Sequence, residues 1–317
     1  MKALSPAALG AICATLAAVF FSVNDLSIKV LSSTYALHQV MLIRSLIGLA
    51  LIALIIAPLT SGPRVARTGR LPMHMLRGLC VVFANMTFFS GLAAMPLADA
   101  VAIFFISPLV ITLLSVVFLR EHVGPYRWVA IAVGFAGVLI MMRPGTEAFQ
   151  PASILPLFSA FCYAAIHIIT RRIRETESAA TMAFYIQVMF IIVSVGFGIA
   201  VGDGRFGDQS DPSLAFFLRA WNWPAPADYP VFLITGVSIA MAGFLISQAY
   251  RVAEASFVAP FEYMALPIAV VWGMVFFDEF PGLWDYVGMV LILGAGLFAV
   301  WRDARSRNAA LQRPLRR

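Results

Sequence analysis

The chain has 317 residues, of which 61% are apolar and 12% are charged, against about a quarter charged in a typical soluble domain. A soluble fold of this length needs far more polar residues to cover its core, so the composition excludes an ordinary soluble enzyme. Lys and Arg number 22 and Asp and Glu 16, a net charge of +6. We attribute this excess to the anchoring of membrane loops rather than to a nucleic-acid partner.

Ten apolar segments follow one another along the chain. They predict ten transmembrane helices, because a helix needs about 20 apolar residues to cross a bilayer. A β-barrel is disfavoured, since the apolar residues come in long runs rather than in alternation. The segments are 7–30, 37–58, 73–94, 97–119, 126–142, 151–173, 179–201, 229–250, 256–277 and 284–301.

The connections are short except for residues 202–228, whose aromatic and acidic residues predict a stretch at the membrane interface. A signal peptide over the first segment is an alternative that we disfavour, because no clear small-residue cleavage site follows it. The cytoplasmic face of a membrane protein carries an excess of Lys and Arg. With the N-terminus inside, most basic residues fall on that face, which predicts an inner-membrane protein with both termini in the cytoplasm.

The second half of the chain weakly repeats the first. Residues 119–129 resemble residues 277–287, and the acidic residues Glu121 and Glu279 are 158 positions apart. Five segments per half is an odd number, so the second half must be inverted in the membrane, as in many transporters. We therefore predict an all-α integral membrane fold with a first repeat over 1–145, a second over 146–305, and a basic cytoplasmic tail over 306–317.

These halves resemble the EamA-like branch of the drug/metabolite transporter superfamily. The resemblance rests on residues 96–100, 107–109 and 119–121, and on residues 259–260, 267 and 277–279. It covers nearly the whole chain and implies ten helices, a central cavity and alternating access. The candidate substrates that it implies are amino-acid derivatives, S-adenosylmethionine, riboflavin and carboxylates. Pro267 precedes Glu279 by one residue fewer than Pro108 precedes Glu121, so we expect a local difference in helix geometry.

Ionisable side chains inside apolar segments are costly and usually face a cavity or a partner. In the first half these are Asp25, Arg44 and Arg77, and Asn85 lies on the same helix face as Arg77. Two interpretations stay open. In the first, Asp25 forms a fixed ion pair with Arg44 or Lys29, Arg77 extends to the inner surface, and Asn85 is a packing residue. In the second, these groups contact the substrate.

In the second half, Tyr163 and His167 are four residues apart and share a helix face. A histidine changes protonation near neutral pH, which would allow proton coupling, whereas the alternative is a hydrogen-bonded packing residue. Gln187 falls near the place in the repeat that Arg44 occupies in the first half. Glu262 is a carboxylate inside the ninth segment, and it is either a proton carrier, a partner for a substrate amine, or part of a salt bridge to an arginine.

These eight residues combine Arg, carboxylate and His side chains, which favours a zwitterion or an organic anion as substrate. We predict a secondary active transporter of a small polar metabolite, with no catalytic residues, metal or cofactor. Nucleophile-elbow, Walker, zinc-protease and Cys-x-x-Cys motifs are missing from the sequence. The alternative is a non-transporting membrane enzyme or an assembly scaffold.

Other features of the sequence are interpreted as structural. Glu121 and Glu279 lie at segment ends, where we expect solvated or helix-capping roles. The glycine clusters at 134–137 and 294–296 predict close packing of the fifth and tenth segments and would also allow a homodimer. The three cysteines have no metal-ligand spacing and are interpreted as packing residues.

Overall fold

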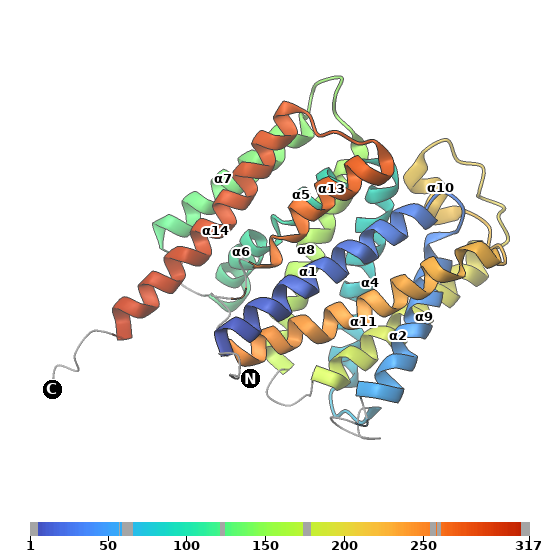
Figure 1. Cartoon of the computed structure of the whole chain (residues 1–317), viewed down its shortest axis with the longest axis horizontal. Helices are drawn as coiled ribbons and strands as arrows, with labels where there is room; N and C mark the ends of the chain where they lie inside the picture. Colours follow the sequence, from blue (N-terminus) through green and yellow to red (C-terminus); the bar gives the residue numbers. More distant parts are fainter. Residues whose placement is uncertain are drawn as a thin grey trace.

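The computed structural model describes residues 6–56, 58, 66–120, 124–173, 179–253, 258 and 261–311, without the side chains of several of them, His167 included. Every regular element in these ranges is helical, and the long helices lie side by side as a bundle (Figure 1). The all-α fold predicted from the apolar runs is confirmed. The principal helices are α1 (Pro6–Leu31), α2 (Leu37–Leu51), α4 (Leu71–Ala94), α5 (Leu97–Phe104), α6 (Ser107–Leu119), α7 (Pro125–Met142), α8 (Ile154–Ile173), α9 (Ala179–Val201), α10 (Pro212–Leu218), α11 (Tyr229–Val252), α13 (Ala265–Phe277) and α14 (Leu283–Leu311).

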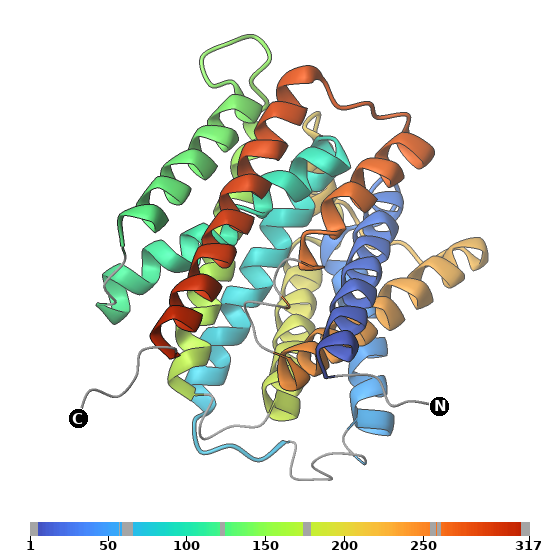
Figure 2. The same cartoon turned by 60° about the vertical axis from the view of Figure 1, so that its left-hand side comes forward.

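Eight helical stretches among the described residues are long and apolar enough to cross a membrane. They coincide with eight of the predicted segments, and the other two, 151–173 and 256–277, contain the shorter apolar helices Pro151–Ile166 and Ala265–Phe277. The count of ten crossings stays a prediction. Figure 2 shows that α1 begins and α14 ends at the same end of the bundle, the arrangement that an even number of crossings requires.

The fourth predicted segment is interrupted rather than continuous. It divides into α5 and α6 at Phe105 and Ile106, and Pro108 is the second residue of α6. A proline has no N–H to donate to the carbonyl four residues earlier, so it starts a helix well and interrupts one that is already formed. Residues 263–264 form the corresponding turn immediately before α13.

Helix boundaries repeat along the chain at a fixed interval. Helices α4 and α11 have 24 residues each and begin 158 positions apart, and α6 and α13 have 13 residues each with the same interval. Both short helices end at a left-handed residue, Arg120 with φ 54° and Asp278 with φ 55°. The expectation that the shifted proline would alter helix geometry in the second half is therefore wrong, because α13 accommodates Pro267 one position deeper in its first turn.

Earlier in each half the interval is shorter. Helix α9 begins 142 positions after α2 begins, and α8 ends 142 positions after α1 ends. The difference arises in the link between α9 and α11, which contains α10. Asp211 caps that helix by accepting a hydrogen bond from the Leu214 N–H at 2.9 Å.

The link also covers the turn between α1 and α2. The Trp221 indole donates to His38 Nδ1, and the Arg219 guanidinium donates to the Ser32 carbonyl at 2.8 Å. The Tyr35 hydroxyl donates to the Asp228 carboxylate at 2.5 Å, and this hydrogen bond raises the pKa of the hydroxyl. These contacts fasten the link over the end of the bundle that is predicted to face outward.

Helices α7 and α14 pack against each other along their lengths, as the glycine clusters predicted. A Cβ atom added at Gly137 would lie 2.9 Å from the Gly288 carbonyl oxygen, so only glycine allows this approach. Gly134 and Gly296 also contact side chains of the same chain, whereas a Cβ atom at Gly294 would meet no atom within 4 Å. A homodimer stays a prediction.

We predict that Gly137→Ala destabilises the protein by about 1–3 kcal/mol, because the added methyl forces α7 away from α14. The measurement is thermal unfolding in detergent, with Gly294→Ala as the matched control. Equal unfolding temperatures for the two variants would show that the close approach of α7 and α14 is not required.

Candidate functional site

Arg44 is the largest fully buried side chain in the described part of the molecule, with 2% of its surface exposed. Its guanidinium donates to the Asn24 side-chain oxygen at 3.4 Å and to the Asn85 side-chain oxygen at 3.3 Å. These hydrogen bonds bring α1, α2 and α4 together around one cation. Within the described residues both acceptors are neutral amides, and the Nε atom of Arg44 is buried without a partner.

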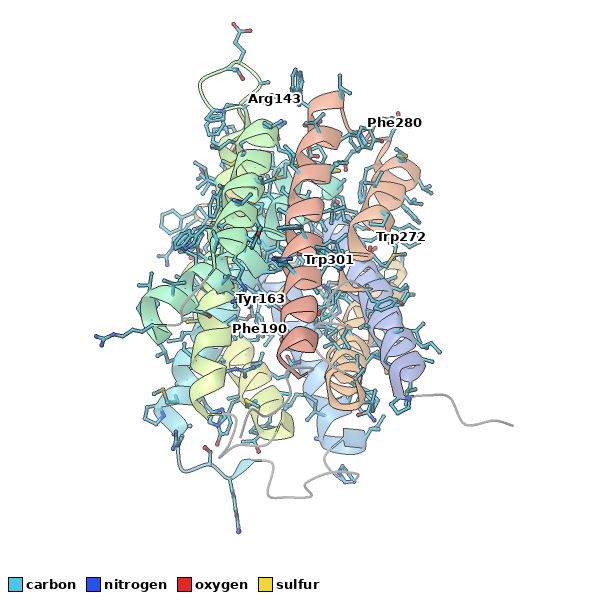
Figure 3. The ribbon with its side chains drawn as sticks, turned by 90° about the vertical axis from the view of Figure 1, so that its left-hand side faces the viewer. Arg143, Tyr163, Phe190, Trp272, Phe280 and Trp301 are labelled. Carbon is cyan, nitrogen blue, oxygen red and sulfur yellow. The ribbon has the colours of Figure 1, made fainter. Side chains whose placement is uncertain are left out.

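Aromatic rings cover the two sides of this guanidinium. Its carbon lies 5.7 Å from the centre of the Phe89 ring and 5.0 Å from that of Phe190. A cation held over aromatic faces is attracted to them without using its N–H groups. The rings therefore stabilise Arg44 in an apolar setting and leave hydrogen-bonding capacity for a further acceptor. Figure 3 shows Phe190 between the two ends of the bundle, well away from the Arg143 end.

Asp25 is linked to Arg44 through its neighbour. The Asn24 amide donates to Asp25 Oδ1 at 3.1 Å, and the two charged groups lie within electrostatic range of each other. Asn24, rather than Asp25, is the α1 residue that bonds Arg44 directly. Asp25 is partly exposed although it belongs to a membrane-spanning helix.

Gln187 reaches the same region from α9. Its side-chain nitrogen lies 2.8 Å from the point where a Cβ atom of Gly48 would stand, and Gly48 is one helical turn after Arg44. The structure thus gathers Asp25, Arg44, Asn85 and Gln187, four of the eight predicted site residues, from four helices. We call Asn24 and these four residues the Arg44 cluster.

Three further predicted residues form a second group. Tyr163 on α8 lies within electrostatic range of Arg77 on α4 and of Glu262, which immediately precedes the turn at 263–264. The Arg77 guanidinium also donates to the Met182 carbonyl on α9 at 3.2 Å. His167 lies on α8 four residues after Tyr163, and its side chain is outside the described part of the chain. We call Arg77, Tyr163 and Glu262 the Tyr163 group.

An aromatic chain joins the two groups. Phe89, which covers Arg44, contacts Phe88, and Phe88 contacts Phe104, each with ring centres 5.2 Å apart. The Phe104 ring in turn lies 5.2 Å from the Tyr163 ring. The sequence analysis did not identify Phe104 or Phe190, because no local pattern distinguishes a lining phenylalanine from a packing one.

Lys29 and Glu279 differ from their predicted roles. Lys29 does not pair with Asp25 but with Glu279, at 2.5 Å. The interpretation of Glu279 as a solvated residue is wrong, because its carboxylate is only partly exposed and bonds a side chain 250 residues away. Its capping role is supported, because it also accepts a hydrogen bond from the N–H of Leu97, the first residue of α5. Glu121 lies outside the described residues. Among those residues, no group of three His, Cys, Asp or Glu side chains could hold a metal ion.

Comparison with known proteins gives one family and several relatives. The model of the EamA-like transporter family matches residues 8–143. A riboflavin transporter of Rhizobium johnstonii is 31% identical over 73% of this chain and 71% of its own length. An S-adenosylmethionine uptake transporter of Rickettsia prowazekii is 27% identical over 93% of both chains. A pseudopaline exporter of Pseudomonas aeruginosa is 25% identical over 90% of this chain and 94% of its own.

A crystal structure of another protein shares the fold. It aligns with a TM-score of 0.62 over 93% of this chain and 98% of that chain, at 19% sequence identity. The overall helix arrangement is therefore one that has been observed experimentally.

We predict that Asn85→Leu lowers the free energy of unfolding by about 1–3 kcal/mol, because it removes an acceptor from a buried cation. Thermal unfolding in detergent measures the change. Thr87→Val is the matched control, since Thr87 is two residues further along α4 and bonds only backbone oxygens of its own helix in the described structure. Equal effects of the two substitutions would contradict the role given to Asn85.

Proposed function

Since the chain belongs to the EamA-like transporter family, within the drug/metabolite transporter superfamily, we propose that it is a secondary active transporter of a small polar metabolite. It is a multi-pass membrane protein. In this proposal it lies in the inner membrane with both termini in the cytoplasm, and residues 1–145 and 146–305 are inverted repeats that open the path to each side in turn.

The repeated helix boundaries support this arrangement of two halves. Phe105 and Tyr263 are equivalent under the interval of 158 residues, and their ring centres are 5.0 Å apart. Equivalent residues that touch must lie close to the axis relating the halves. Each sits where an apolar segment is interrupted, which is the kind of place where transporters bind substrates, near the middle of the membrane.

The observation that carries the proposal is the Arg44 cluster. A buried guanidinium that bonds two neutral amides and keeps an unpartnered Nε is suited to a substrate anion, above all a carboxylate, which accepts paired hydrogen bonds from arginine. Asp25 beside Arg44, and Glu262 in the Tyr163 group, supply carboxylates for a substrate amine. The two polar groups and the aromatic chain between them suit a zwitterion or an organic anion.

The relatives are named for three different substrates. The Arg44 cluster allows two of these, S-adenosylmethionine and riboflavin, to be compared as substrates of this chain. S-adenosylmethionine contains an α-amino-acid carboxylate, whereas riboflavin has none. A guanidinium that requires an anion therefore favours amino-acid derivatives and other carboxylates over riboflavin. Because the relatives are named as transporters, transport is also favoured over a membrane enzyme or an assembly scaffold.

Uptake into proteoliposomes tests the proposal. A thermal-shift screen over amino acids, S-adenosylmethionine, riboflavin and carboxylates first identifies ligands, because a ligand of the native state raises its stability. We predict that Arg44→Gln then lowers carboxylate uptake about tenfold or more, the loss of one charge-assisted hydrogen bond.

The control for Arg44→Gln is Arg205→Gln, which changes an exposed arginine paired only locally with Asp203 in the described structure. Unchanged uptake by the Arg44 variant would remove the anion role of that residue. Absence of flux for the whole metabolite set, with folded protein, would contradict transport itself.

Glu262→Gln tests the proton coupling considered for this carboxylate. If Glu262 carries the coupled proton, the amide variant loses the dependence of uptake on a pH gradient, because it can neither bind nor release a proton. The same uptake assay at several gradients measures this. A pH profile identical to that of the unmodified protein would leave Glu262 as a substrate or packing contact only.

A further inference from the structure

A cluster of charges closes the end of the bundle that is predicted to face outward. Lys29, in the last turn of α1, donates to Glu279 Oε1 at 2.5 Å and to the Met95 carbonyl at 2.9 Å. The second carboxylate oxygen of Glu279 accepts a hydrogen bond from the Leu97 N–H at 2.9 Å. The Lys29 and Glu279 side chains are 8% and 24% exposed, so the ion pair is sheltered from water.

The backbone holds Glu279 in place for this contact. Asp278 ends α13 in the left-handed conformation, φ 55°, a conformation in which aspartate is one of the few tolerated residues. The Glu279 N–H then donates to the Gly273 carbonyl at 3.0 Å and completes the last turn of the helix. The Phe277 ring lies 4.7 Å from the Lys29 ammonium and shields it further. The position of the Glu279 carboxylate is thus fixed by a hydrogen-bonded turn at the end of α13.

The ion pair lies beside the packing of α13 on α5 and on α1. On one side are α1 and the joint between α4 and α5, and on the other is the connection from α13 to α14. Helix α1 packs along α11 but contacts α13 over a much shorter stretch. The packing of α13 on α5 and α1 is less extensive than that of α1 on α11 or of α7 on α14, so a separation at the ion pair disrupts less packed surface than one elsewhere in the bundle.

A buried ion pair can also be stable when dry and yet separate easily in water. Removing one partner leaves a stranded charge, whereas moving both partners into water restores the hydration of each. The contact is therefore stable while the region is dry and is released at small cost when water enters between the two bodies.

We propose that Lys29 and Glu279 form the outer gate of the transport path. The proposal rests on the proposed alternating access. The pair is bonded when the path is closed to the outside, and it separates into water when the path opens. In this step Glu279, on the connection from α13 to α14, moves away from Lys29 at the end of α1.

Asp99 gives Lys29 a second partner in the open state. It lies on α5, within electrostatic range of Lys29, and its Oδ1 atom is buried with no hydrogen bond among the described residues. The other charged groups facing Asp99 are Glu279, Asp285 and Arg143, and Arg143 already bonds Asp285 at 2.6 Å. Lys29 is therefore the cation available to Asp99. In the open state, after Glu279 has moved away, the Asp99 carboxylate neutralises the Lys29 ammonium.

The pair of Arg143 and Asp285 provides a matched control. It lies at the same end of the molecule, where Figure 3 labels Arg143, and it also connects the two halves. It joins α7 to α14, however, and these two helices share one of the most extensive contacts between the described helices. Breaking this ion pair removes a similar contact at a place that does not open.

The test measures water access from the outer side and needs no substrate. Cys13, Cys80 and Cys162 are replaced by Ala, and Ser90→Cys is added as a reporter on α4, where the Ser90 side chain is buried. It lies five residues before Met95, about 8 Å deeper along the helix. Right-side-out vesicles are treated with a membrane-impermeant maleimide, and the rate of labelling is compared among gate variants.

We predict about tenfold faster labelling in Lys29→Met and in Glu279→Gln, a shift of about 1.4 kcal/mol toward the open state. Arg143→Met should label at the unmodified rate, and Asp99→Asn should label more slowly, because the open state loses its partner for Lys29. Unchanged labelling in both gate variants, or equal acceleration in the Arg143 control, would overturn the gate. If the labelling rates are as expected but no metabolite is transported, the gate is supported and only the proposed transport is contradicted.

Discussion

A guanidinium ion enclosed within apolar helices is the constraint on which much of this molecule depends. Arg44 can remain charged there only because side chains from α1, α4 and α9 surround it with amide oxygens and ring faces. Each of these helices must therefore approach α2 at one height. The fold is organised around a cation whose hydrogen bonds are incomplete, and the incomplete part is what makes the position suitable for a ligand.

The two polar groups and the ion pair at the outer end divide the work of a transporter among different physical effects. In the proposed mechanism, the Arg44 cluster and the Tyr163 group provide selectivity through fixed charges inside the membrane, where few competing interactions exist. Lys29 and Glu279 would provide closure, because a buried ion pair is stable while it is shielded from water and is weakened when water enters. The aromatic chain between the polar groups is apolar yet flat, so a substrate can slide along it without being held by directional hydrogen bonds.

The sequence predicted the helices well because length and hydropathy decide which segments enter a membrane, and both are local properties. It also predicted Asp25, Arg44 and Asn85 as inward-facing, since a polar residue in a lipid-facing position is costly. It failed for Glu279, whose partner is 250 residues away, and it did not identify Asn24, whose contact with Arg44 depends on how α1 is rotated in the bundle. The interruption at Phe105 has a local signal, because Pro108 follows closely and a proline starts a helix more readily than it continues one.

The unequal intervals of the repeat, 142 residues before α10 and 158 after it, have a consequence for the resting state. Two halves related by exact inverted symmetry would make the inward-open and outward-open conformations equal in energy. The extra residues around α10 lie on one face only and fasten the α1–α2 turn through Tyr35, His38 and Ser32. In the proposed transporter these contacts exist on one side only, so they would favour the conformation that is closed on that side, and the preference would come from an insertion rather than from the transport path.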